Sequence, residues 1–221
     1  MKKGLTELVF ILDRSGSMEG LEKDTIGGFN SMLKKQKKQE GEVNVTTVLF
    51  DDEIDIIHDR FPISAVKNLT DNDYYVRGCT ALLDAVGSTV KKVENIQKRL
   101  PDELRAENII FVITTDGYEN ASQEYTANMV KKMIGKNQER GWQFIFLGAN
   151  IDAVSEAEKI GIKRTHAVSY KNDSKGVALN YAVAGNVIDH MIRCDFFDSD
   201  AEEEISELLR PISDYLEDDE D

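Results

Sequence analysis

A chain of 221 residues with 41% hydrophobic content is long enough to bury one substantial core and too short to favour two separate domains. Its net charge of −14 is concentrated at one end, because residues 198–221 hold twelve acidic residues and one arginine and leave about −3 for the rest. This distribution argues against nucleic acid as a partner, since no basic surface stands out and the acidic end repels phosphates.

An apolar run near the N-terminus is predicted to be a buried strand and not a targeting segment. The run Leu8–Leu12 is five residues long, lies between Glu7 and Asp13, and is followed by no small-residue cleavage site. No stretch approaches the eighteen or so apolar residues of a membrane helix. We therefore expect a soluble, cytoplasmic protein without membrane contact, with Cys79 and Cys194 as free thiols.

Short runs rich in Val, Ile and Phe alternate with longer amphipathic stretches. The apolar runs are typical of strands buried on both faces, and the amphipathic stretches are typical of helices. In chain order we predict a strand at 5–12, a helix at 21–39, strands at 43–50 and 53–61, a helix at 80–100, a strand at 107–114, a helix at 123–140, a strand at 142–148, a helix at 152–160, a short strand near 165–169 and a helix at 174–194. The alternation predicts an α/β fold, a doubly wound, mostly parallel sheet with helices on both faces.

Two segments depart from this alternation. The short turn at Asp51-Asp52 joins two predicted strands directly, which indicates an antiparallel hairpin at a sheet edge. The acidic end has apolar residues at helical spacing, but Pro211 is expected to end or kink that helix and leave a loose acidic end. We therefore divide the chain into a domain of residues 1–197 and an acidic helix or tail of residues 198–221.

Polar clusters occur where parallel sheets bind ligands, beyond the carboxyl ends of the strands. They are Asp13-Arg14-Ser15-Gly16-Ser17 after the first strand, Gly78-Cys79-Thr80 before a helix, and Asp116-Gly117 after the strand at 107–114. Together they supply two carboxylates and three hydroxyls, an oxygen-only set that suits a hard cation such as Mg²⁺ better than Zn²⁺. Two carboxylates neutralise a divalent cation and hydroxyls are weak donors, so the metal keeps affinity for an Asp or Glu of a partner protein.

The order Asp-x-Ser-x-Ser, a Thr before a helix and a later Thr-Asp-Gly resembles the metal-ion-dependent adhesion site of von Willebrand factor type A domains. The five motif positions are present as Asp13, Ser15, Ser17, Thr80 and Asp116. The resemblance covers roughly residues 5–195. It implies that the serines and the threonine contact the metal directly and that the aspartates often act through water, with Mg²⁺ as the expected ion and Mn²⁺ or Ca²⁺ as alternatives.

The chain resembles the stand-alone bacterial or phage members of this family more than the secreted adhesion proteins. Such members work beside AAA-type ATPases or within stress-resistance and phage-associated systems, so the resemblance implies a protein partner of that kind. One departure is Cys79, which stands where many relatives have Gly or Ser. A neutral thiol is a poor ligand for Mg²⁺, so we expect this side chain to point away from the metal.

Each cluster taken singly has a simpler interpretation. Asp13-x-Ser-x-Ser could be a polar loop with a helix cap, Thr80 an N-cap, and Asp116-Gly117 a turn. The metal-site hypothesis is favoured because all three clusters follow strands that should be neighbours in the sheet. Residues that flank the motif, as a partner-selecting rim or as plain surface, are Met18, Glu19, Arg77, Tyr118 and Asn120.

Enzymatic alternatives lack essential residues. Phosphotransfer enzymes with a nucleophilic Asp after the first strand have Asp-x-Asp, whereas Ser15 here leaves the general acid missing. Serine-hydrolase, P-loop and dinucleotide-binding motifs are absent from the sequence, and its three histidines share no spacing. We favour a non-enzymatic, metal-dependent protein-binding module; a metal-dependent phosphoesterase and a subunit in which the metal only stabilises the fold remain alternatives.

Overall fold

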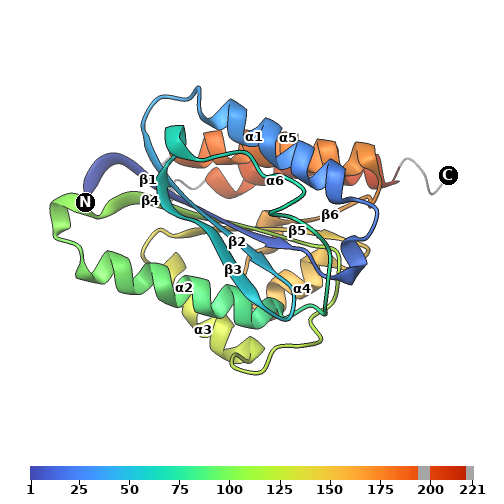
Figure 1. Ribbon diagram of the computed structural model, residues 1–221. Coiled ribbons are helices and arrows are strands. Elements are labelled where there is room, and N and C mark those ends of the chain that lie inside the picture. Colours follow the sequence, from blue (N-terminus) through green and yellow to red (C-terminus); the bar gives the residue numbers. More distant parts are fainter. Residues whose placement is uncertain (194–199, 218–221) are drawn as a thin grey trace.

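In the computed structural model, which describes residues 1–193 and 200–217, a six-stranded sheet lies between two layers of helices (Figure 1). The strands are β1 (Lys2–Asp13), β2 (Glu42–Phe50), β3 (Ile54–Pro62), β4 (Ala106–Thr115), β5 (Gln143–Ala149) and β6 (Ala167–Tyr170). The helices are α1 (Glu22–Gln36), α2 (Leu82–Arg99), α3 (Ala127–Gln138), α4 (Ala153–Lys159), α5 (Ser174–Arg193) and α6 (Ala201–Glu217). Helices α1, α5 and α6 cover one face of the sheet, and α2, α3 and α4 cover the other.

The strand order β3-β2-β1-β4-β5-β6 confirms the predicted doubly wound sheet. All neighbouring strands are parallel except β2 and β3, which form the predicted antiparallel hairpin at the sheet edge. The chain builds outward from β1 in one direction to β2 and in the other direction to β4. The carboxyl ends of β1 and β4 therefore form the crevice in which open α/β sheets bind ligands.

The central strand β1 shows why the apolar runs form strands. Successive side chains of a strand point to opposite faces, and here both faces are covered by helices. Phe10 and Leu12 pack in the core shared with α1, α5 and α6, whereas Val9 and Ile11 pack in the core shared with α2, α3 and α4. All four side chains are buried, so this run holds Asp13 at a fixed place at the end of the strand.

Helix α3 begins at residue 127, later than the predicted start at residue 123. The preceding residues form a loop because the carboxylate of Asp84, in the first turn of α2, accepts hydrogen bonds from the backbone N–H groups of residues 123, 124 and 125 at 2.7–2.9 Å. Thr126 then caps the helix by accepting the N–H of Met129. Long-range hydrogen bonds have replaced the first predicted helical turn.

Pro211 was expected to end or kink the last helix, and an end of the helix at this residue is wrong. Helix α6 continues through this proline from Ala201 to Glu217. Pro211 lies on the exposed side, where water can solvate the carbonyl group that loses its N–H partner. Buried residues on both sides of the proline, among them Ile205 and Ile212, pack into the α1–α5 core and hold the helix in place.

Several expectations concern single residues. Trp142, at the start of the strand predicted at 142–148, is a core residue stacked on Phe111 with ring centroids 5.8 Å apart. Cys79 is exposed with a free thiol. Cys194 and the acidic end beyond Glu217 lie outside the described residues. None of the helices in the described part of the chain combines the length and apolar character needed to cross a membrane.

Candidate metal site

The structure brings the five motif residues together at the carboxyl ends of β1 and β4. Asp13 is the last residue of β1, and Asp116 directly follows β4, its neighbour in the sheet. Ser15 and Ser17 lie in the loop after β1, and Thr80 lies just before α2. Three segments that are distant in sequence therefore supply one cluster of oxygen atoms.

The three hydroxyl groups form a row that leads to Asp116. Thr80 Oγ1 donates to Ser15 Oγ at 3.0 Å, Ser15 Oγ lies 3.0 Å from Ser17 Oγ, and Ser17 Oγ donates to Asp116 Oδ1 at 2.5 Å. Each hydroxyl uses its single hydrogen within this row and keeps at least one lone pair free. The row thus leaves several oxygen lone pairs available to a cation.

Asp13 is fixed by hydrogen bonds to both carboxylate oxygens. Oδ1 accepts the N–H of Ser15 at 2.7 Å and Oδ2 accepts the hydroxyl of Thr115 at 2.5 Å. The Tyr74 hydroxyl donates to the Asp13 carbonyl oxygen at 2.5 Å. Burial raises the pKa of the Asp13 carboxyl, although the hydrogen bonds from Thr115 and Ser15 act in the opposite direction. Asp13 therefore orients the loop that carries Ser15 and links it to Thr115 at the end of β4.

Asp116 has one carboxylate oxygen that the rest of the structure does not satisfy. The side chain is 3% exposed, and Oδ2 is buried without a hydrogen-bond partner among the described residues. Burial, with a smaller contribution from the charge of Asp13, raises the pKa of Asp116 to about 6 despite the hydrogen bond from Ser17. A buried carboxylate oxygen without a partner is costly, and a bound cation would satisfy it. The residues present therefore fit a divalent metal ion.

Gly117 leaves the space next to this oxygen cluster free. A Cβ atom at this position would lie 2.9 Å from Thr80 Oγ1 and 3.1 Å from Ser17 Oγ. Any side chain would therefore enter the space between the two hydroxyls. The Asp-Gly pair that a simpler interpretation treats as a turn is required here to keep the oxygens accessible.

The structure also decides the alternative interpretation of Thr80. Helix α2 begins two residues later than predicted, and its N-cap residue is Ala81, with no side-chain cap hydrogen bond. The Thr80 side chain is directed to Ser15 instead, and its backbone N–H donates to Asn120 Oδ1 at 2.9 Å. Thr80 is therefore part of the hydroxyl row and not a helix cap.

Some flanking residues have roles that the sequence did not reveal. Met18, considered as a rim residue, is 1% exposed and belongs to the core. Asn120 is exposed at the rim but holds the backbone of Thr80. The sequence does not identify Thr115 or Tyr74 as partners of Asp13. Thr115 binds the Asp13 carboxylate from a distant part of the sequence, and Tyr74 binds the main-chain carbonyl group of Asp13, which any residue would offer. Glu19 and Tyr118 are exposed, and Tyr118 is 54% exposed.

The site depends on hydroxyl oxygens. In residues 1–193 and 200–217, no group of three or more His, Cys, Asp or Glu side chains is placed to hold a metal ion. His58 and His166 are buried away from the motif, His58 beside Thr47 and His166 beside Thr165. A metal held by the motif residues would thus have two carboxylates and three hydroxyls nearby, a set that lacks nitrogen and sulfur.

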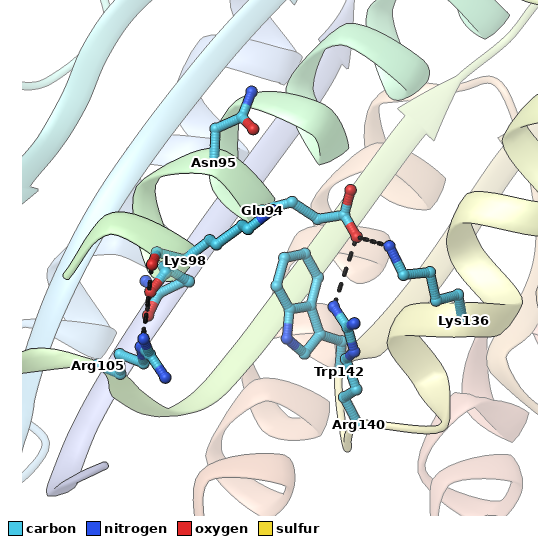
Figure 2. Close-up of a pocket in the computed structure, with 8 residues that line it drawn as sticks. Glu94, Asn95, Lys98, Arg105, Lys136, Arg140 and Trp142 are labelled. Carbon is cyan, nitrogen blue, oxygen red and sulfur yellow. Dashed lines mark hydrogen bonds and ion pairs between the residues drawn. The ribbon is translucent and has the colours of Figure 1, made fainter. Parts of the chain in front are cut away.

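A basic pocket of about 450 Å³ lies at the opposite, amino-terminal end of the strands (Figure 2). Glu94 of α2 pairs with Lys136 at 3.0 Å and with Arg140 at 3.6 Å, and Figure 2 shows both ion pairs made by the same carboxylate oxygen. Arg105 donates to the carbonyl oxygens of Gln97 and Leu100 at the end of α2. Cations at the carboxyl ends of helices compensate unpaired carbonyl groups, so we assign this pocket a structural role.

Comparisons with known proteins identify the fold. No protein-family model matches the sequence, and no curated protein sequence matches it. The von Willebrand factor domain of the type V pili tip protein Mfa5 from Porphyromonas gingivalis is similar, with a TM-score of 0.58 and 13% identity over 86% of this chain and 96% of that domain. A von Willebrand factor type A protein from Catenulispora acidiphila is similar, with a TM-score of 0.52 and 13% identity over 81% of this chain and 42% of that one.

Proximal thread matrix protein 1 from the mussel byssus, in a structure whose adhesion motif is occupied by zinc, is also similar. The TM-score is 0.55 with 15% identity over 84% of this chain, and the match spans less than half, 46%, of the mussel chain. Identities this low show the fold alone. The expected von Willebrand factor type A fold is thus confirmed.

Proposed function

We propose that this domain, which has the fold of von Willebrand factor type A domains, is a metal-dependent protein-binding module. Asp13, Ser15, Ser17, Thr80 and Asp116 would hold one divalent cation. The observation that carries the proposal is the buried Asp116 Oδ2, which has no hydrogen-bond partner among the described residues and lies in an oxygen cluster whose hydroxyl row ends on the same carboxylate. If these residues formed only a turn or a helix cap, no buried carboxylate oxygen would be left without a hydrogen-bond partner.

We propose Mg²⁺ as the ion, with Mn²⁺ or Ca²⁺ as alternatives, because every candidate ligand is an oxygen atom. Zinc at the adhesion motif of the mussel protein supports a divalent cation in general. When bound, the cation supplies an electrophilic centre that accepts one more anionic oxygen. The two carboxylates balance its charge, and the neutral hydroxyls leave it attractive to a partner's Asp or Glu.

The site residues favour binding over catalysis. Ser17 is exposed while Asp13 and Ser15 are buried, so an incoming carboxylate would approach from the Ser17 side. The described part of the chain places no histidine beside the motif to act as a general base. A non-enzymatic role in the cytoplasm, beside a partner such as an AAA-type ATPase or a stress-resistance complex, is the proposal that fits these features and the exposed free thiol of Cys79.

Calorimetric titration of Mg²⁺ and Mn²⁺ into metal-free protein, with Asp116→Ala and Ser15→Ala as variants, tests the site. One saturable site that is lost or greatly weakened in both folded variants is the expected result. No saturable heat in the wild type would overturn the proposal. Metal-dependent retention of an identified partner, lost when one Asp or Glu of that partner is changed to Ala, tests the binding mode.

The same samples separate the two alternatives. A phosphoesterase would hydrolyse p-nitrophenyl phosphate or bis-p-nitrophenyl phosphate with Mg²⁺ or Mn²⁺, and Asp13→Asn would abolish that turnover. A purely structural metal would raise the melting temperature without changing the affinity for any partner. We expect neither result.

A further inference from the structure

Asp51, in the turn between β2 and β3, connects two of the three segments that form the candidate metal site. Its side chain is fully buried, and Oδ2 accepts hydrogen bonds from Arg14 Nε at 2.8 Å and from Arg77 Nε at 2.7 Å. Oδ1 accepts the backbone N–H of Glu53 at 2.6 Å, which fixes the carboxylate in its own turn. One carboxylate thus joins two guanidinium groups from different loops.

Arg14 carries the first connection. It stands between Asp13 and Ser15, yet it is only 1% exposed, an unusual position for a charged residue in a surface loop. Its guanidinium pairs with Asp51 and also with Asp55 of β3. The backbone N–H of Arg14 donates to the carbonyl oxygen of Phe50 at 2.8 Å, so both its main chain and its side chain are tied to the β2–β3 hairpin.

The second connection runs through Arg77 to the segment that carries Thr80. The backbone N–H of Arg77 donates to the carbonyl oxygen of Arg14 at 3.0 Å. The N–H of Ala81, the residue after Thr80, donates to the carbonyl oxygen of Asp51 at 2.9 Å. Asp51 therefore binds this segment on both sides of Thr80, through the Arg77 side chain and through its own main chain.

Further contacts show that the two loops must lie close together. Gly16 N–H donates to the carbonyl oxygen of Gly78 at 3.2 Å. Gly78 has a φ of +65°, a backbone conformation that favours glycine, and a Cβ atom there would lie 1.7 Å from Asp52 Oδ1, so a larger residue would strain the backbone and displace the Asp52 side chain. The hydroxyl groups of Thr80, Ser15 and Ser17 can form their row only when these two loops lie side by side as they do here.

We propose that Asp51 is a positioning residue for the metal site, and that its carboxylate sets the distance between the serine loop and Thr80 through Arg14 and Arg77. The inference rests on the proposed function for the identity of the ligand, because the hydroxyls it spaces are the proposed metal ligands. Asp51 does not contact the metal in this assignment. It orders the loops before the metal binds, so that binding requires little rearrangement.

The charges of the same cluster give a way to test positioning against a simple electrostatic effect. Two guanidinium groups near a cation site oppose cation binding unless carboxylates neutralise them. Asp51→Asn removes a negative charge, whereas Arg77→Gln removes a positive charge. An electrostatic effect alone predicts that the first variant weakens metal binding and the second strengthens it. Positioning predicts that both variants weaken it, because each breaks the connection between the loops.

The test measures Mn²⁺ affinity by calorimetry and, in metal-free protein, amide hydrogen exchange at Gly16 and Ala81. We expect Asp51→Asn and Arg77→Gln each to weaken Mn²⁺ binding at least tenfold and to accelerate exchange at both amides at least tenfold. Arg77→Lys, which keeps the charge but loses the planar donor geometry, should restore exchange protection only in part. Arg77 is 36% exposed, so its variants should fold even if Asp51→Asn does not.

Arg60→Gln is the matched control. Arg60 of β3 pairs with buried Glu7 of β1 at 2.5 Å, so the variant likewise removes a partly exposed arginine from a buried carboxylate, but outside the loops that carry the motif. Exchange at Gly16 and Ala81 within twofold of wild type in Arg77→Gln would overturn the proposal. Equal acceleration in Arg60→Gln would overturn it as well. If the wild type binds no Mn²⁺ but Arg77→Gln still accelerates exchange selectively, the proposed function fails and the positioning of the loops by Asp51 stands.

Discussion

Replacing Asp116 with Asn should stabilise the metal-free protein and abolish its response to metal. The pKa of Asp116 is raised from an ordinary value of 3.8 to about 6 because the carboxyl group is buried. The ionised form is therefore less stable in the folded protein than in the unfolded chain. At about 1.4 kcal/mol for each pKa unit, ionisation at neutral pH costs about 3 kcal/mol of folding free energy.

The net gain from Asp116→Asn is smaller than this cost. The amide oxygen can still accept the Ser17 hydroxyl, but the amide nitrogen would take the place of the unpartnered Oδ2, and a buried donor without a partner costs about 1 kcal/mol or more. We expect a net stabilisation of about 1–2 kcal/mol at pH 7.5 with a chelator present. For a domain of this size that corresponds to an increase in Tm of about 2–8 °C.

The sign of the pH dependence follows from the raised pKa. Between about pH 4 and 6 the folded state binds more protons at Asp116 than the unfolded state does. Wild-type stability from this group is therefore present at low pH and is lost as the pH rises through about 6. The advantage of Asp116→Asn should be largest at pH 7.5 and should shrink at pH 5. An excess of Mg²⁺ at about 100 times its Kd should add about 2.7 kcal/mol to the wild type alone and reverse the order.

Urea denaturation followed by circular dichroism, with chelator or with Mg²⁺, measures these differences. The matched control is Asp152→Asn, an exposed carboxylate that caps α4 at the same edge of the sheet. Since Asn and Asp cap helices about equally well, this control should change stability little. If Asp116→Asn were less stable than wild type in chelator at pH 7.5, the carboxylate would be an ordinary structural acceptor and the reasoning would be refuted.

Three further predictions concern Asp116, the space beside Gly117 and the packing of α6. The apparent Mn²⁺ affinity should fall about tenfold for each pH unit below about 6, because Asp116 must lose its proton to bind the cation; calorimetry between pH 5 and 7.5 checks this. Gly117→Ala should weaken Mn²⁺ binding at least tenfold in a folded protein, since the new methyl group would lie 2.9 Å from Thr80 Oγ1; affinity equal to wild type would contradict the assigned space. Leu209→Ala should destabilise the protein by about 2–4 kcal/mol in urea denaturation, since this α6 side chain is 3% exposed within the core, and a change below about 0.5 kcal/mol would show that α6 does not pack there.

The features that the sequence predicted well are those set by local pattern. The apolar run ending at Leu12 specifies a strand buried on both faces, and Asp13 follows it directly. The spacing of Ser15 and Ser17 after that strand identifies the oxygen cluster. Alternation of strands and helices indicated a parallel sheet, and the polar residue after each strand was therefore placed at the correct edge. The meeting of Asp13 and Asp116 then required β1 and β4 to be neighbours, which the structure shows.

The features that the sequence did not predict depend on contacts between distant residues. Asp51 lies in a segment whose sequence is typical of a turn. Nothing near it in sequence indicates that it binds Arg14, 37 residues away. Asp84 likewise delays the start of α3 by accepting backbone hydrogen bonds about 40 residues further along the chain. Pro211 was expected to end or kink α6 from local propensity alone, but the helix continues through it because packing on both sides of the proline outweighs the tendency to end there.

The hairpin at the edge of the sheet also bears on how this domain meets other proteins. An outer strand offers unpaired backbone groups that can add a strand from another chain and lead to aggregation. Along β3, charged Asp55 and Asp59 recur, the pairing with β2 has two irregularities, and the strand ends at Pro62. At the other edge, β6 is only four residues long and packs against α6. Neither edge is a good template for strand addition, so backbone pairing would compete little with the proposed association through side chains at the carboxyl end of the sheet.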